Sequence, residues 1–235
     1  MKRIVQLLFF LFVITDVVAQ DANPTISFYS KTEEADVTLS PGESHTTQAP
    51  LSITCTANVN SYPGYKEDYE WIIYLTDEGE ASPIVNRFDQ DIQYTLTRSG
   101  GYGIKLKITF SNAANDTIEY ESDVFNIVIS ASKLSCPDGF SPNGDQRNDM
   151  FFFTMESIVK LDGAIFNRWG QKLFTFTLEN AEKGWDGRQG GNYVKDGAYL
   201  LSVNAVGSDG VKYRIRKAIN VLKGLLESNE TSTGN

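Results

Sequence analysis

The chain has 235 residues, of which 41% are hydrophobic and 22% charged, which is ordinary for a globular protein of one or two domains. Its net charge of −9 argues against nucleic-acid binding, because phosphate contacts need Lys and Arg. Residues 20–131 hold 17 acidic and 6 basic side chains (−11), whereas residues 132–235 hold 12 and 13 (+1). This break favours two domains with different surfaces.

Residues 1–19 have the pattern of a secretory signal peptide. Lys2 and Arg3 precede an apolar run that is too short for a comfortable bilayer span. Short side chains end at Ala19, so we expect cleavage between Ala19 and Gln20. An uncleaved membrane anchor is the alternative. The pattern predicts an exported protein.

Residues 20–131 are predicted to form an immunoglobulin-like β-sandwich. Leu51–Val59 alternates apolar and polar side chains, and Tyr69–Leu75 places Trp71 where it packs in the sandwich centre. Gly- and Asn-rich turns separate further strands, and no helical period is present. These further strands are expected at residues 92–97, 104–110 and 117–129.

The rest of the chain is predicted to be a linker (132–138), a second β-sandwich (139–224) and a flexible tail (225–235). Strands are expected at residues 150–153, 159–168, 173–178, 198–206 and 211–222. The predicted fold class is therefore all-β, with two immunoglobulin-like β-sandwich domains in tandem after a signal peptide.

Two cysteines are present in a chain whose compartment permits disulfides. Cys55 alternates with apolar residues and is expected to face a core, while Cys136 lies in the linker. A bridge between Cys55 and Cys136 would tie the two domains together. An inward Cys55 argues against that bridge, and both options stay open.

Four short motifs follow one another in the C-terminal part of the chain. They are Phe140-Ser-Pro-Asn-Gly-Asp145, Phe166-Asn-Arg-Trp-Gly170, Trp185-Asp-Gly187 and Gly197-Ala-Tyr199. In this order they resemble the gliding-motility-associated C-terminal domain, the type B sorting domain of the type IX secretion system of Bacteroidetes. The resemblance covers nearly all of residues 139–223, although the family usually has glycine at the position of Gln146.

This resemblance implies an immunoglobulin-like signal domain that is carried across the outer membrane to the cell surface. The implied partners are the type IX secretion machinery and an outer-membrane barrel of the PorP/SprF type. The first domain loosely resembles PKD-like domains of bacterial surface proteins through Ala49-Pro50-Leu51, Tyr69-Glu70-Trp71 and Gly100–Gly103. That second resemblance implies a spacer or contact module without enzymatic activity.

Four oxygen-bearing side chains crowd one loop of the second domain, and they are Asn143, Asp145, Asn148 and Asp149. Calcium prefers several oxygen ligands at alternating loop positions, so a Ca²⁺ site is one interpretation. Asx turns, in which these side chains bond their own backbone, are the other. The spacing does not fit an EF-hand, which favours turns; no other cofactor is expected.

Candidate docking residues are Arg168, Trp169, Trp185, Lys212, Arg214 and Arg216. Arg and Trp are enriched at binding hot spots, so Arg168 and Trp169 are either an exposed docking pair or a cap on the core. The basic stripe of the last strand is either a solvated face or a surface for an acidic partner, such as the acidic first domain of a neighbouring molecule.

Asp116-Thr117-Ile118 matches the Asp-Thr-aliphatic pattern of Bacteroidetes O-glycosylation, which makes Thr117 a candidate modification site. His45 is the only histidine, so neither a Ser–His pair nor a histidine-based zinc site is supported, and we expect no enzyme.

The sequence favours a non-enzymatic protein that the type IX system exports to the cell surface or the medium. A resident accessory subunit at the periplasmic face of the outer membrane and a glycan-binding module are the alternatives.

Overall fold

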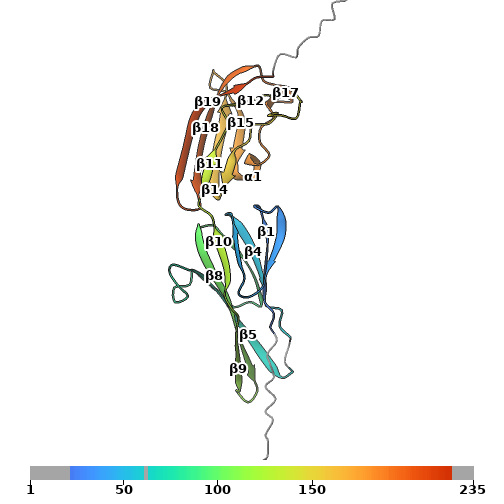
Figure 1. Ribbon diagram of the computed structural model, residues 1–235, viewed down its shortest axis with the longest axis vertical. Helices are drawn as coiled ribbons and strands as arrows, with labels where there is room; N and C mark the ends of the chain where they lie inside the picture. The colour runs from blue at the N-terminus through green and yellow to red at the C-terminus, as the bar shows by residue number, and fades with distance from the viewer. Residues whose placement is uncertain (1–21, 61–62, 224–235) are drawn as a thin grey trace, which may run out of the picture.

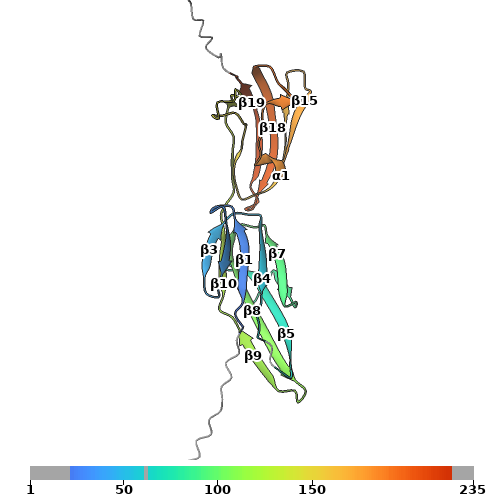
Figure 2. The same ribbon diagram turned by 90° about the vertical axis from the view of Figure 1, so that its right-hand side faces the viewer.

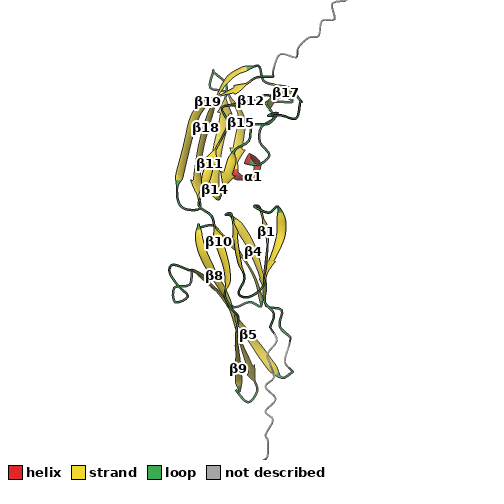
Figure 3. Ribbon diagram, in the orientation of Figure 1, coloured by secondary structure: helices red, strands yellow, loops and turns green. Residues whose placement is uncertain are grey.

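Two β-sandwich domains lie end to end in an elongated molecule (Figures 1 and 2). The computed structural model describes residues 22–60 and 63–223. The predicted signal peptide, its cleavage point at Ala19 and Gln20, and the predicted tail 225–235 lie outside these residues. Within them, no helix has the length and apolarity to cross a membrane. The predicted all-β tandem fold is confirmed, and Figure 3 shows helix in one short segment.

The N-terminal domain consists of two facing sheets. Its strands are β1 (Thr25–Ser30), β2 (Ala35–Leu39), β3 (Ser44–Thr47), β4 (Leu51–Thr56), β5 (Tyr65–Leu75), β6 (Val85–Arg87), β7 (Asp91–Leu96), β8 (Gly100–Asn112), β9 (Thr117–Glu121) and β10 (Phe125–Ile129). One sheet has the order β2-β1-β4-β7, and the other has the order β3-β10-β8-β5-β6, with β9 also pairing β8. The single strand predicted over residues 117–129 is interrupted at residues 122–124. Its two parts, β9 and β10, pair with successive segments of the same edge of β8, because β5 occupies the other edge.

The core of this domain follows the period-two pattern of its strands. On β4, Leu51, Ile53 and Cys55 are buried and the intervening residues face outward, as the alternation predicts. Burial raises the pKa of the Cys55 thiol to about 12, so it packs as a small hydrophobe. Trp71 is fully buried as expected, and its indole Nε1 donates to the Gln90 carbonyl at 3.0 Å.

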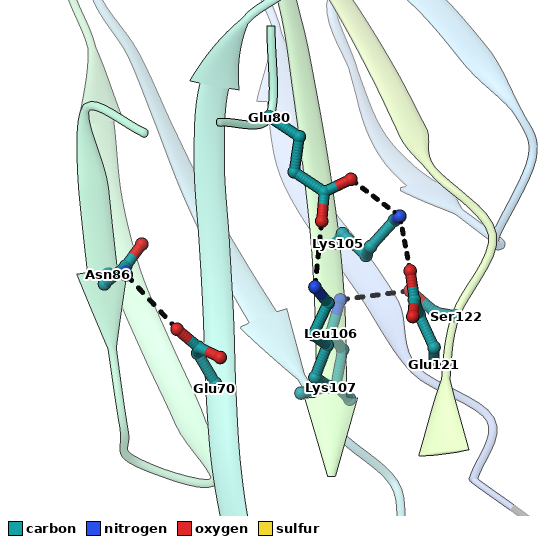
Figure 4. A network of polar contacts seen from close by, with 8 residues as sticks. All are labelled: Glu70, Glu80, Asn86, Lys105, Leu106, Lys107, Glu121 and Ser122. Atoms are coloured by element: carbon teal, nitrogen blue, oxygen red, sulfur yellow. Dashed lines mark hydrogen bonds and ion pairs between the residues drawn. The ribbon is translucent and has the colours of Figure 1, made fainter. Parts of the chain in front are cut away.

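A charged network covers the outer face of β8 (Figure 4). Glu80 accepts from Lys105 at 2.8 Å and from Lys107 at 2.9 Å, and Lys105 also reaches Glu121 at 2.5 Å. The hydrogen bonds that Lys105 donates to Glu121 and Glu80 raise the pKa of its ammonium group, and those that Glu80 accepts from Lys105 and Lys107 lower the pKa of its carboxyl. The two lysines are therefore already neutralised within the domain.

The C-terminal domain has one five-stranded sheet of order β12-β19-β18-β14-β15, partly covered by smaller elements. Its elements are β11 (Lys133–Ser135), β12 (Gly139–Phe140), β13 (Thr154–Glu156), β14 (Ile158–Phe166), β15 (Lys172–Thr177), α1 (Leu178–Ala181), β16 (Arg188–Gln189), β17 (Asn192–Tyr193), β18 (Gly197–Gly207) and β19 (Lys212–Val221). The long central strands agree with the sequence prediction.

Two local predictions in this domain differ from the structure. The predicted linker 132–138 contains β11, which pairs with β13, so this segment belongs to the second domain. The strand predicted at residues 150–153 is only a single bridge between Phe151 and Trp185. The apolar run at 151–153 reflects the buried Phe151 and Phe153 rings, and regular pairing begins later, at Thr154.

Hydrogen bonds fix the junction between the domains. Ser157 Oγ accepts from the Ala49 amide at 3.2 Å, and the Ser208 carbonyl accepts from the Ser99 amide at 3.1 Å. The connecting segment is held from the other side, because Asp209 accepts from the Ser132 amide at 3.0 Å and from its hydroxyl at 2.7 Å. Backbone and side-chain bonds together thus restrain the angle between the sandwiches.

Replacing Asp209 with alanine is expected to loosen this junction while leaving both sandwiches folded. The donors on Ser132 lower the pKa of the Asp209 carboxyl, so its contribution is present above the ordinary aspartate pKa and is lost as the pH falls through the lowered value. Small-angle scattering should show a broader range of molecular dimensions for Asp209→Ala at neutral pH than for the wild type. Asp209→Asn, which keeps one acceptor, is the control, and identical scattering for Asp209→Ala and the wild type would contradict the prediction.

Candidate functional site

The sequence motifs meet at the end of the C-terminal domain that lies away from the first domain (Figure 1). β14 starts next to the junction residue Ser157 and ends at Phe166, so the turn holding Arg168 and Trp169 lies at the opposite end. β18 runs antiparallel to β14 and brings the motif at Gly197 to the same end. The topology therefore gathers motifs that are separated along the chain at one end of the domain.

An Asx turn presents Trp169 to solvent. Asn167 Oδ1 accepts from the Trp169 and Gln171 amides, both at 3.0 Å, and Gly170 takes the left-handed conformation with φ of 81°. Trp169 is 76% exposed, and the Arg168 guanidinium carbon lies 4.4 Å from its ring centroid. The interpretation of Trp169 as a cap on the core is therefore wrong, whereas the stacking of Arg168 on it is present.

A second aromatic–cation pair lies across a groove from the first. Tyr193, on the β16–β17 hairpin, is 43% exposed, and Arg188 lies 4.2 Å from its ring centroid while donating to its hydroxyl at 2.9 Å. The groove has a volume of about 570 Å³, and Trp169, Tyr193, Lys195 and Tyr199 are among its lining residues. Aromatic and Arg side chains around a concave surface are the composition of protein-binding hot spots.

Sequence reasoning missed Tyr193 and Arg188 as members of this surface. The signal was present, because Gly190-Gly191 between Gln189 and Asn192 is a typical two-residue hairpin turn. Such a hairpin brings its flanking residues side by side. What the sequence does not show is that this hairpin faces the Trp169 turn.

Trp185 is buried, so its side chain is not available to a partner in this structure. The ring is 0% exposed and lies in an aromatic cluster with Phe140, Phe174 and Tyr199. Its Nε1 donates to the Arg188 carbonyl at 2.9 Å, and its backbone pairs with Phe151. Trp185 therefore supports the hairpin that carries Arg188 and Tyr193.

The loop at residues 143–149 is organised by Asp149. One carboxylate oxygen accepts from the Asn143 amide at 2.9 Å and from the Gly144 amide at 2.7 Å, and the other accepts from the Gln146 amide at 2.7 Å. Asp145 accepts from the Arg147 amide at 2.8 Å, and that bond is the main reason why the pKa of the Asp145 carboxyl is lowered.

These bonds correspond to the Asx-turn interpretation of the loop, because backbone amides occupy the oxygens that a calcium ion would need. Asn148 and Gln146 have positive φ values of 55° and 65°, so a residue in the left-handed conformation stands where the resembling family usually has glycine. In the parts of the chain that the structure describes, no group of three or more His, Cys, Asp or Glu side chains is placed to hold a metal ion.

The remaining candidate residues lie apart from the groove. Lys212, Arg214 and Arg216 are exposed on the outer face of β19, as the alternation predicts. Thr117 is exposed at the start of β9 in the other domain. Cys55 and Cys136 are free thiols, so the bridge between the two domains is not formed.

The structure thus defines a β-sandwich whose distal end carries a groove with two aromatic–cation pairs beside a tightly bonded Asx loop. Residues 134–219 match the family model described as the CHU_C type IX secretion signal domain. The chain therefore carries a type IX secretion signal domain, and the match begins within β11.

Solved structures with similarity to this chain include fibronectin(III)-like modules of CbhA from Clostridium thermocellum, with 16% identity over 77% of this chain and 89% of that chain (TM-score 0.23). Dimeric latent PorU from Porphyromonas gingivalis has 11% identity over 88% of this chain (TM-score 0.26), and the match spans only 20% of the PorU chain. A tetra-tandem repeat in the extending region of a large adhesion protein has 11% identity over 88% of this chain and 68% of that chain (TM-score 0.25). No curated protein matches the sequence.

Proposed function

We propose that this chain is a non-enzymatic protein exported by the type IX secretion system, with the C-terminal domain as its address. The match of residues 134–219 to the type IX secretion signal domain carries this proposal. The first domain then acts as a spacer or adhesive contact module on the cell surface or in the medium. Charged side chains are exposed over much of this domain, and Tyr29 and Phe88 are exposed aromatic side chains that could serve such a contact.

The groove at the distal end is the surface by which we propose that the export machinery recognises the domain. Trp169 is held in an exposed position by the Asn167 turn, which reduces the entropy that it loses on binding. Tyr193 and Arg188 across the groove complete a contact surface of two aromatic rings and two guanidinium groups.

Deleting residues 139–235 is expected to leave the protein in the periplasm, whereas the full chain reaches the cell surface or the medium. Mass spectrometry of protein recovered from periplasm, surface and medium measures this and also reports the termini and any glycan on Thr117. Surface exposure of the truncated protein would contradict the sorting role. Recovery of the full chain only from the envelope, bound to an outer-membrane barrel, would instead favour the resident accessory subunit.

The same fractionation tests the groove in the full chain. Trp169→Ala is expected to lower the exported fraction at least about tenfold, since hot-spot truncations cost about 2 kcal/mol or more. Tyr29→Ala is the matched control, because Tyr29 is also an exposed aromatic (54%) but belongs to the first domain. Unchanged export of Trp169→Ala would remove the groove from the proposal and leave the address function of the domain intact.

A further inference from the structure

The outer face of the C-terminal sheet is basic and uncovered. The inward side chains of β14, β18 and β19 form the domain core, and the alternate side chains point to solvent. Five exposed cations lie on these strands and on β15, and we call them the basic face: Lys160, Lys172, Lys212, Arg214 and Arg216. Asp162 is the carboxylate that lies among them on β14.

The strand register arranges this face in rows. Lys160 pairs with Val206 and Val206 with Lys212, and in the next row Asp162 pairs with Asn204 and Asn204 with Arg214. Small and short side chains in the middle rows leave a groove of about 640 Å³ between β14 and β19. Lys212, Arg214 and Arg216 follow one wall at intervals of about 6.8 Å, the spacing of alternate strand residues.

These cations are not neutralised within the chain. Among residues 22–60 and 63–223, none of the five side chains of the basic face forms an ion pair, in contrast to Lys105, Lys107 and Lys217. Five charges on an uncovered sheet face repel one another, and an anionic partner would relieve that repulsion.

The same chain carries a surface of opposite charge at its other end. A groove of about 580 Å³ on β5, β8 and β9 is lined by Asp68, Glu70, Glu119 and Glu121, and we call it the acidic groove. Lys107 in this groove is already held by Glu80, and Asp68 is paired with Lys66 at 2.6 Å. Glu70 accepts from the Asn86 side-chain amide at 3.2 Å and forms no ion pair with any residue that the structure describes (Figure 4). Phe88 lines the groove and is 69% exposed, which supplies an apolar contact.

The two surfaces cannot meet within one molecule. The acidic groove lies on the part of the first domain where β5 and β9 extend away from the junction, and β18 and β19 belong to the second domain (Figures 1 and 2). The junction bonds of Ser157 and Asp209 hold the two sandwiches end to end. Any contact between the basic face and the acidic groove must therefore join two copies.

We infer that the basic face binds the acidic groove of a second copy of this chain. The contact is heterologous, because each copy offers two different surfaces, so it extends head to tail instead of closing a symmetric dimer. Arg214 and Arg216 supply planar guanidinium groups that pair with carboxylates through two hydrogen bonds each. The inference is independent of how the chain is exported.

An anionic bilayer is the competing occupant of the basic face, and charge disfavours it. The first domain, residues 20–131, carries a net charge of −11. An anionic bilayer is negative over its whole surface and therefore repels this domain. In the acidic groove of a second copy, by contrast, the negative charge is confined to a patch that would lie opposite the basic face. The basic face of one copy is thus complementary in charge to the acidic groove of another.

Sedimentation velocity on the purified full chain tests the inference. Concentration-dependent oligomers are expected at about 50 mM salt and monomers at about 500 mM salt, where the Debye length is roughly 4 Å. Arg214→Gln with Arg216→Gln neutralises both guanidinium groups of the basic face, and Glu70→Gln with Glu119→Gln neutralises two of the four carboxylates of the acidic groove. Each double variant alone is expected to associate at least about tenfold more weakly.

Mixing the two double variants gives the decisive result. One has an intact acidic groove and a weakened basic face, and the other has the reverse, so the mixture should form a 1:1 dimer as its main associated species. Arg147→Gln with Lys183→Gln is the matched control, because it removes two exposed cations elsewhere in the domain and should associate like the wild type.

Three results would overturn the inference. They are a monomeric wild type at low salt, a mixture that stays monomeric, and a wild type that binds phosphatidylglycerol vesicles through Arg214 and Arg216 without forming oligomers. Unchanged circular dichroism of all variants shows that they are folded.

Discussion

Replacing Trp185 with alanine is expected to lower the free energy of unfolding of the C-terminal domain by about 3–5 kcal/mol, the usual cost of deleting a buried aromatic ring. The ring is fully buried, and the Phe140 centroid lies 5.4 Å from its own. The Arg188 carbonyl also loses its donor. A domain of this size shifts its melting temperature by about 4–8 °C per kcal/mol, so a decrease of about 15 °C or more should be seen.

Differential scanning calorimetry measures this decrease, because the two sandwiches have separate cores and each domain unfolds with its own transition. Trp169→Ala is the matched control, since the same side chain is removed from an exposed position. Its effect should stay within about 0.5 kcal/mol. Equal destabilisation by the two substitutions would show that Trp185 is not the support we describe, and Trp185→Phe should recover part of the loss.

This contrast between two tryptophans shows where sequence reasoning reaches its limit. Both stand in Asn- or Asp-containing turns next to glycine, so local pattern alone gives them the same interpretation. Burial is decided by the topology: β14 ends at Phe166 and carries Trp169 beyond the sheet, while the bridge to Phe151 draws Trp185 inside. Such long-range pairing has no short-range signal in the sequence.

Strands with one buried face were predictable because their alternation is visible in the residues. The inward Cys55 and the outward Lys212, Arg214 and Arg216 both follow from a period of two. Edges and junctions were harder to predict, since β11 and β13 are only three residues long and leave no periodic pattern. The order of four motifs identified the sorting domain, although none of them revealed the groove.

The acidic end of the first domain and the basic face of the second have different origins in the sequence. The basic face arises from the alternation of inward and outward side chains along neighbouring strands, and this alternation can be seen in the sequence. The acidic groove combines β5, β8 and β9, and its effective charge depends on which lysines Glu80 and Glu121 already hold. Net charge per domain showed the asymmetry, and only the ion pairs show which carboxylates remain free of a cation.

Replacing Asp149 with alanine is expected to destabilise the C-terminal domain by about 1–3 kcal/mol, because amides that bonded to a carboxylate lose their acceptor. Three amides are affected, and the closest distances are 2.7 Å. Water replaces part of this loss, since the loop lies at the surface. Asp149→Asn keeps one acceptor oxygen and should recover part of the stability, whereas Glu179→Gln is a control that removes an exposed acidic charge from the short helix.

The wild type and Asp149→Ala together decide between the Asx-turn and the calcium interpretation of this loop. If Asp149 serves only the backbone, millimolar calcium should leave the melting temperature of the wild type unchanged, because a ligand that does not bind the folded state adds no stability. A calcium-dependent rise that Asp149→Ala abolishes would instead show that the loop exchanges its amide partners for a metal ion. The Asx turn would then be the metal-free arrangement of a site, and the bonds of Asp149 would be those that the ion must displace.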